Sequence, residues 1–222
     1  MKKYLYLSIA ISVIYIVYVI STNLIIDPQA THFLSNKKNL NYHMNVSVWL
    51  IVLYIHVISA CLGMISGAIN FSTKILQKNR KLHRINGYLY LLSVSVACLT
   101  SGYMAPFATG GRINSIGFNM MNIIWLVVTI TAYVQIKRKR INQHRNWMVR
   151  SYVYCYTNMF IQVITFALYN GFGIHYDISY TIAVYVTILL NFIIAEVIIR
   201  KVFRVPTQIK SIKKEITSNL TN

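Results

Sequence analysis

Acidic residues are nearly absent from this chain of 222 residues, which contains only Asp27, Asp177, Glu196 and Glu215. Hydrolysis by a pair of carboxylates, and coordination of calcium or magnesium, both need several carboxylates close together. The sequence also contains no glycine-rich phosphate-binding loop and no soluble domain of useful size. The composition therefore argues against a soluble enzyme. We assign no catalytic residue, and we leave enzymatic activity undecided, with the balance against it.

Cysteine is scarce as well. Cys61, Cys98 and Cys155 all lie in apolar stretches and show no Cys-x-x-Cys spacing. This pattern indicates neither a disulfide framework nor a zinc site, so we expect three small packing residues and no metal. The three prolines all fall just beyond the ends of apolar stretches, where a missing N–H costs little.

Only 12% of the residues are charged, compared with about 25% in soluble domains, while 56% are hydrophobic. Six apolar stretches, with no charged residue except Arg150 in the fifth and Glu196 in the sixth, are each long enough to cross about 30 Å of hydrocarbon. They are residues 4–26, 47–71, 85–104, 117–136, 148–170 and 178–199. The first is too long for a signal peptide and lacks a cleavage site. We predict an all-α, polytopic transmembrane bundle of six spans, with one transmembrane domain at 1–204 and a basic cytoplasmic tail at 205–222.

Most of the basic residues lie on one side of the predicted membrane. All but three of the 22 lie at the N-terminus, in the second-to-third and fourth-to-fifth connections, or in the C-terminal tail. The opposite side holds only Lys37, Lys38 and Arg112. Because cytoplasmic loops collect Lys and Arg, both termini are predicted to be cytoplasmic. The same rule explains the net charge of +18, so the expected partner is the lipid bilayer and no nucleic acid is expected.

Small and polar residues recur at helical spacing in three of the predicted spans. The stripes are His56, Ser59, Gly63, Gly67 and Asn70; His83, Gly87, Tyr90, Ala97 and Ser101; and His144, Met148, Ser151, Cys155, Asn158, Gln162, Thr165 and Tyr169. Helices pack through such residues in lipid, so we expect a core of the second to fifth helices, with the first and last flanking it. The alternative is that each polar residue only stabilises helix packing through a hydrogen bond, which contributes roughly 0.6 to 2 kcal/mol.

The two cytoplasmic hairpins repeat one pattern, a basic run followed by His83-Arg84 in one copy and His144-Arg145 in the other. Both hairpins have the same orientation, as in a parallel repeat. If the repeat is real, His83 and His144 are equivalent and face each other. His56 lies about 14 Å into the bilayer, too far to share a metal ion with them.

A set of polar residues falls within the predicted spans: His56, Asn70, Asn158, Gln162 and Glu196. His56 is either a functional residue or a neutral ring bonded to a Ser or a carbonyl. Arg150 and Glu196 lie at similar depth, so we predict that they pair, directly or through His144. A pair within one helix, between Glu196 and Arg200, competes with this.

Three pieces of sequence, in order, resemble a known family. They are a helical His56 followed by Gly63 and Gly67, then Leu82-His83-Arg84-x-x-Gly87-x-x-Tyr90, then His144-Arg145-x-Trp147-Met148-x-Arg150-Ser151. Together they span about residues 51–165. They resemble a family of predicted bacterial membrane proteins known as domain of unknown function 2306. The resemblance implies a multi-pass protein of the bacterial cytoplasmic membrane and marks these positions, but it implies no reaction, substrate or cofactor.

Three functions compete at this point. In the first, His83 and His144 are axial ligands of a b-type haem whose propionates meet Arg84, Arg145 and Arg150. A relay across the membrane would need a second pair near the outer face, where only His32, His43 and His175 are present. In the second, a transporter or ligand sensor, His56, Asn158 and Gln162 line a polar cavity reached from outside. In the third, the protein is a non-catalytic assembly or partner subunit whose basic loops dock a protein or lipid headgroups. The sequence leaves the ligand, the cofactor and the oligomeric state open.

Overall fold

The computed structural model describes residues 2–35 and 44–202, and every regular element in these ranges is a helix. The long helices are α1 (Lys2–Ile20), continued by the π-helical turn η1 (Ser21–Ile26), α3 (Val46–Asn70), α5 (Arg80–Met104), α6 (Arg112–Lys137) and α9 (Tyr176–Val202). Short elements connect them: α2 (Thr31–Ser35), α4 (Thr73–Lys78) and the 3₁₀ turn η2 (Ala105–Phe107). The predicted all-α class is confirmed. Lys37, Lys38, His43 and the basic tail lie outside the described residues.

The fifth predicted span, at residues 148–170, is not one continuous helix. The chain forms α7 (Ile141–Val153), the 3₁₀ turn η3 (Tyr154–Tyr156), α8 (Thr157–Phe166) and the π-helical turn η4 (Ala167–Gly171). In the described ranges, five helices are each long and apolar enough to cross a membrane, and this broken segment is not among them. Every residue from Ser151 to Tyr156 is buried, because the segment has neighbouring helices on all sides.

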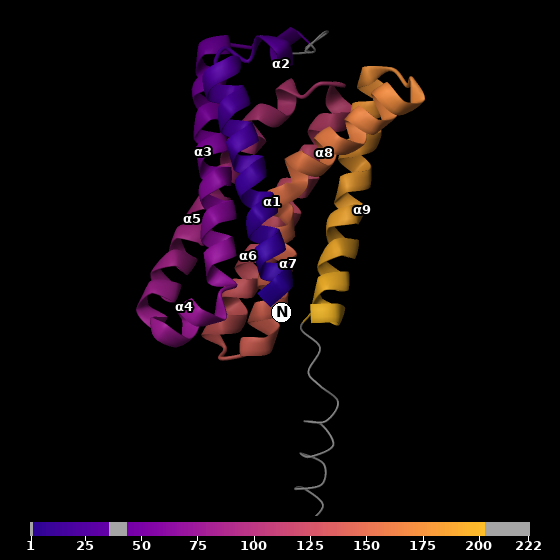
Figure 1. The fold of residues 1–222 in the computed structure, drawn as a ribbon. Helices are drawn as coiled ribbons and strands as arrows, with labels where there is room; N and C mark the ends of the chain where they lie inside the picture. Colours follow the sequence, from indigo (N-terminus) through magenta and orange to yellow (C-terminus); the bar gives the residue numbers. More distant parts are fainter. Residues whose placement is uncertain (1, 36–43, 203–222) are drawn as a thin grey trace, which may run out of the picture.

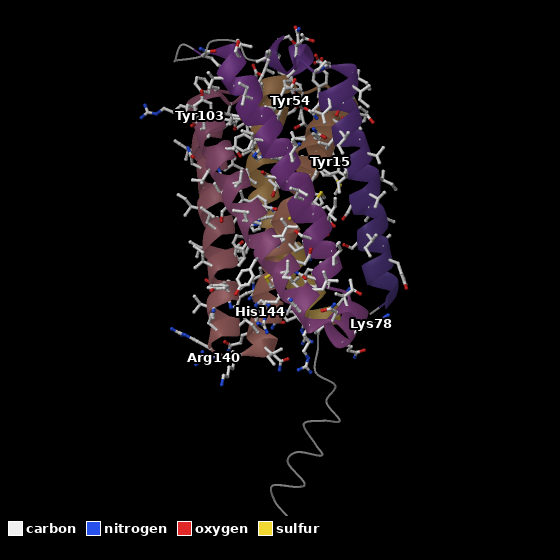
Figure 2. The ribbon with its side chains drawn as sticks, turned by 90° about the vertical axis from the view of Figure 1, so that its left-hand side faces the viewer. Tyr15, Tyr54, Lys78, Tyr103, Arg140 and His144 are labelled. Carbon is white, nitrogen blue, oxygen red and sulfur yellow. The ribbon has the colours of Figure 1, made fainter. Side chains whose placement is uncertain are left out.

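Successive long elements run in opposite directions (Figure 1). The start of α1, the α3–α5 hairpin with its short α4, the α6–α7 turn and the end of α9 all lie at one end of the bundle. Figure 2 places Lys78, Arg140 and His144 at this end, and Tyr54 and Tyr103 at the other. We call the end with the basic turns the basic end.

Asparagine side chains begin two of the long helices. Asn45 accepts a hydrogen bond from the backbone N–H of Val48 at 3.3 Å, and Asn79 accepts one from Leu82 at 2.9 Å. Such N-caps satisfy backbone donors that have no partner inside the helix. Near the middle of α3, His56 bonds across to the carbonyl oxygen of Ala97 in α5 and so connects the two helices.

The last helix belongs to the core, so the expectation that it merely flanks the bundle was wrong. Five of its side chains are fully buried: Ser179, Ala183, Val184, Thr187 and Asn191. Apart from Asn191, they are small or β-branched, and they let α9 approach α8 and α6 closely. Gly117 of α6 contributes, because a Cβ there would lie 2.8 Å from Cγ1 of Val184. The first helix does flank the bundle, as expected, since most of its large apolar side chains are exposed.

The small-residue stripe of α3 has its expected role. Gly63 and Gly67 are both buried, but only Gly67 is closely approached by a side chain. The ring of Tyr152, from α7, lies directly over Gly67, and a Cβ at this position would overlap with its Cδ2 and Cε2 atoms. At Gly63 the nearest atoms, on Ser93 and Cys155, would be at 3.8 and 4.0 Å. Gly67 is therefore the position that sets the distance between α3 and α7.

These distances predict opposite effects for two substitutions. Gly67→Ala should lower the free energy of unfolding by about 1–3 kcal/mol, because the added methyl group overpacks a buried ring. Gly63→Ala is the matched control and should be neutral or slightly stabilising, because alanine favours the helix and has room. Unfolding in mixed detergent micelles measures both. Equal destabilisation by the two substitutions would contradict the assignment.

Candidate functional site

One short segment of α7, η3 and the start of α8 bonds to every other long helix. Its residues, 150–157, form what we call the hub. The hub side chains that make these bonds are Arg150, to α9; Ser151, to α5 and α6; Tyr152, to α3 and α1; Tyr156, to α1; and Thr157, to α9. The position of this single segment thus determines how the whole bundle is joined.

Ser151 lies within a chain of buried hydroxyl groups. Its Oγ is 2.7 Å from the Tyr90 hydroxyl and 2.7 Å from Oγ1 of Thr129. Thr129 donates to the carbonyl oxygen of Trp125 at 2.6 Å, so its hydroxyl accepts from Ser151. Ser151 in turn accepts from Tyr90. Each hydroxyl therefore has a defined direction, as buried polar groups require where no water can replace a missing partner.

A second hydroxyl cluster joins the hub to the flanking helix α1. The Tyr152 hydroxyl donates to the carbonyl oxygen of Met64 at 3.1 Å, which holds its ring against Gly67. The Tyr156 hydroxyl lies 2.7 Å from Oγ of Ser12. Ser12 donates to the carbonyl oxygen of Ser8, four residues earlier in α1, at 2.8 Å. These contacts attach the first half of an otherwise lipid-facing helix to the core.

The predicted pairing of Arg150 with Glu196 is confirmed, and it is direct. Nε and Nη2 of Arg150 lie 2.8 and 2.7 Å from Oε1 of Glu196. The guanidinium group also stacks on the ring of Trp147, 4.5 Å from its centroid. Both side chains are partly exposed, at 23% and 38%. Charged groups in a membrane helix are costly alone, so each lowers the cost of the other.

Two histidines make the same contact in different hairpins. Nδ1 of His56 lies 3.0 Å from the carbonyl oxygen of Ala97 and 3.1 Å from Oγ1 of Thr100. Nδ1 of His144 lies 2.8 Å from the carbonyl oxygen of Ala132. A carbonyl oxygen only accepts, so Nδ1 carries the proton in both rings. These contacts match the alternative considered for His56, a ring bonded to a carbonyl. Each histidine connects the two helices of its own hairpin.

The structure brings some of the predicted site residues together and separates others. His83 and His144 are close enough to interact electrostatically, whereas His56 bonds at a different level of the bundle. Arg84 is exposed and Arg145 half-buried. Asn70, with its amide nitrogen toward α5, donates to the carbonyl oxygen of His83 at 3.2 Å.

A metal centre with several ligands finds no support in this arrangement. Within residues 2–35 and 44–202, no group of three or more His, Cys, Asp or Glu side chains is placed to hold a metal ion together. The haem hypothesis therefore rests on the neighbouring rings of His83 and His144 alone.

A groove of about 530 Å³ lies between α1, the segment from α8 to η4, and α9. Its lining consists mainly of aromatic and apolar side chains, with three polar ones. The lining residues are Tyr15, Tyr18, Met159, Gln162, Val163, Thr165, Phe166, Tyr169, Asn170, Tyr176 and Tyr180. Of the three residues expected to line a polar cavity, Gln162 lines this groove, while Asn158 donates to the hydroxyl of Tyr15, a lining residue, at 3.0 Å. His56 is not part of this lining.

The polar groups of the groove are sparse. Oγ1 of Thr165 is buried and has no hydrogen-bond partner within the described part of the chain. The rings of Tyr176 and Tyr180 stack at 6.1 Å, and Tyr169 meets Tyr176 edge-on at 5.8 Å. Sequence analysis missed the tyrosines from α1 and α9. Their spacing of three or four residues on one helix face was the available signal.

Helical composition, apolar spans and a basic end together define a polytopic membrane protein. The chain belongs to the family described as Predicted membrane protein (DUF2306), which matches residues 53–199. Comparisons with curated proteins and with solved structures gave no significant match. The matched region contains the hub, the ion pair and both carbonyl-bonded histidines. It extends beyond the predicted 51–165 to include nearly all of α9, in keeping with the burial of that helix.

The ion pair predicts a coupling between two substitutions. Arg150→Ala and Glu196→Ala should each lower the free energy of unfolding. The loss in the double variant should be about 1 kcal/mol smaller than the sum of the two single losses. Unfolding in detergent micelles supplies the double-mutant cycle. Arg200→Ala, on the exposed side of α9, serves as the control and should be additive with Glu196→Ala to within about 0.5 kcal/mol. Additivity of the first pair would contradict a stabilising ion pair.

Proposed function

We propose that this protein crosses the bacterial cytoplasmic membrane six times, with both termini in the cytoplasm, and that it binds a lipid-soluble small molecule in the groove between α1, α8 and α9. Five long helices support this topology, and we infer that α7, η3 and α8 together form the sixth crossing. The basic turns at one end of the bundle support the orientation, since cytoplasmic loops collect Lys and Arg.

The proposal that the protein binds a lipid-soluble small molecule rests on the groove. Its volume falls within the roughly 300–1,000 Å³ of small-molecule sites, which combine apolar and aromatic walls with a few polar groups. Phe166 and Val163 line it and are 68% and 60% exposed. In a membrane, exposed apolar side chains at this depth face lipid, so the groove opens sideways into the bilayer. An occupant that enters by this route must be soluble in lipid.

The lining also defines the chemistry of the occupant. Stacked tyrosine rings favour a flat apolar body, because aromatic faces pack in offset or edge-on arrangements. The exposed Gln162 amide favours one hydrogen-bonding group on that body. We therefore infer a sensor or carrier of amphipathic ring compounds.

Irregular helix turns flank the groove on two sides. The π-helical turn η1 follows Tyr18 in α1, and the π-helical turn η4 contains Tyr169 and Asn170. Single π-helical turns within α-helices are frequent at functional sites. Neither the contacts of His83 and His144 nor the comparisons support the haem or redox role, so ligand binding is the function that the geometry favours.

The proposed orientation predicts the accessibility of introduced cysteines. In intact cells, a membrane-impermeant maleimide should label Arg112→Cys and should leave Arg138→Cys unlabelled, because the two positions lie at opposite ends of α6. Permeabilised cells should label both, which controls for reactivity. Labelling of Arg138→Cys in intact cells would overturn the orientation.

Occupation of the groove predicts a specific loss of binding. The fluorescent membrane-soluble amine 1-aminoanthracene should bind the purified protein saturably. Thr165→Trp should weaken this binding by about tenfold or more, because the indole occupies the volume that the ligand needs. The control is Ile130→Trp, which adds the same ring on the lipid-facing side of α6. Equal binding by Thr165→Trp and Ile130→Trp, in variants that unfold cooperatively, would refute the groove as a site.

A further inference from the structure

Tyrosine is the commonest residue in the walls of the groove, and the tyrosines come from three separate elements. On α1, the rings of Tyr15 and Tyr18 stack with their centroids 6.2 Å apart and an angle of 28° between their planes. Further tyrosines come from η4 and α9. Tyr18 of α1 and Tyr169 of η4 are 50% and 48% exposed, so a molecule in the groove can reach rings from two different elements.

The lining of the groove contains no side chain of Lys, Arg, His, Asp or Glu. The face of an aromatic ring carries partial negative charge, and several rings together hold organic cations such as quaternary ammonium groups. An anion in the groove would meet no positive side chain, and a charge removed from water without a partner is costly. Of the two signs of charge, only a positive one therefore finds partners in this lining.

The charged residues of the bundle favour the same sign. Figure 2 places Tyr15 nearer to Tyr54 than to the basic turns, so the groove is in the half of the bundle away from the basic end. Asp177 is in the first turn of α9, directly after the lining residue Tyr176. Among the residues that the structure describes, Arg112 is the one Lys or Arg at this end, and it begins α6, which contributes nothing to the lining.

The directions of the helices add to this effect. Both α1 with η1 and α8 with η4 run away from the basic end, so both finish at the end where the groove lies (Figure 1). The C-terminal end of a helix carries partial negative charge, which acts within about the last turn. Tyr169 and Asn170 belong to η4 itself, so the lining reaches that turn. The opposite charge at the start of α9 is offset by Asp177.

We infer that the groove binds a lipophilic aromatic cation, that is, a flat ring system with a quaternary or delocalised positive charge. This inference rests on the proposed function of the groove and narrows the class of its ligand. The ring system packs among the tyrosine rings, and the positive group lies against the faces of Tyr18 and Tyr169. Because its charge is spread over apolar groups, such a cation leaves water at a lower cost than a compact ion and can enter from the bilayer.

The test compares three ligands that share one naphthalene ring and differ in charge. They are (1-naphthylmethyl)trimethylammonium, its uncharged carbon isostere 1-neopentylnaphthalene, and the anion 1-naphthaleneacetate. Displacement of 1-aminoanthracene from the full chain in maltoside micelles gives each dissociation constant, corrected for partition into protein-free micelles. The cation should bind about tenfold more tightly than the isostere and than the anion, because each ring that faces a cation contributes roughly two- to fivefold.

Two double variants separate the ring faces from the shape of the groove. Tyr18→Leu combined with Tyr169→Leu removes both half-exposed rings, so the ratio of the dissociation constants for isostere and cation should fall from about ten to about two or less. Tyr18→Phe combined with Tyr169→Phe keeps the rings and should retain the ratio within about twofold. The ratio compares two ligands of one shape in one protein, so a general loss of affinity leaves it unchanged.

The outcomes distinguish this inference from the proposed function. Binding of 1-aminoanthracene without a preference for the cation would overturn the inference and leave the groove as a site for neutral ring compounds. A preference that persists in the leucine variant would overturn it as well, because the tyrosine faces would not be its source. Absence of saturable binding, both for 1-aminoanthracene and, by calorimetry, for the cation, would refute the groove as a site and the inference with it.

Discussion

Polar groups buried among helices in lipid must find partners within the protein, and the hub between Arg150 and Thr157 is where this chain meets that requirement. Its hydroxyl groups, apart from that of Tyr154, bond to α1, α3, α5, α6 and α9, and its one charge is neutralised by Glu196. These bonds need close approach, which Gly67 permits by leaving space for the Tyr152 ring.

The hub also accounts for where the groove lies. Toward the basic end, α1 is attached to the core through Ser8 and Ser12. Beyond these residues α1 presents Tyr15 and Tyr18, and the space between them and α8 and α9 is the groove. The two bonded histidines hold the remaining hairpins: His56 connects α3 to α5, and His144 connects α6 to α7. The bundle is therefore closely joined around the hub and open to lipid at one side, which is the arrangement that a binder of lipid-soluble molecules needs.

Sequence reasoning succeeded where one physical rule dominated. The length of the apolar stretches predicted the helices, and the distribution of Lys and Arg predicted the basic end. The cost of an unpaired charge in a membrane helix predicted the ion pair of Arg150 with Glu196. It failed for α9, whose Ser179 and Thr187 look unremarkable in an apolar helix yet are fully buried. It also missed the tyrosines of the hub and those that α1 and α9 contribute to the groove. A tyrosine can face lipid, a helix or a cavity with little change in local pattern, so its role depends on its neighbours.

The amino-acid sequence by itself determined that the chain is a helical membrane protein, roughly where its helices lie, and which end carries the positive charge. These properties depend on hydropathy and charge summed along the chain, which neighbouring helices do not alter. Only the tertiary structure decided that Tyr152 lies against Gly67, that His144 donates to Ala132, and that a groove opens beside Tyr15. Each of these depends on the rotation and separation of helices distant in sequence, and close packing between particular side chains sets both.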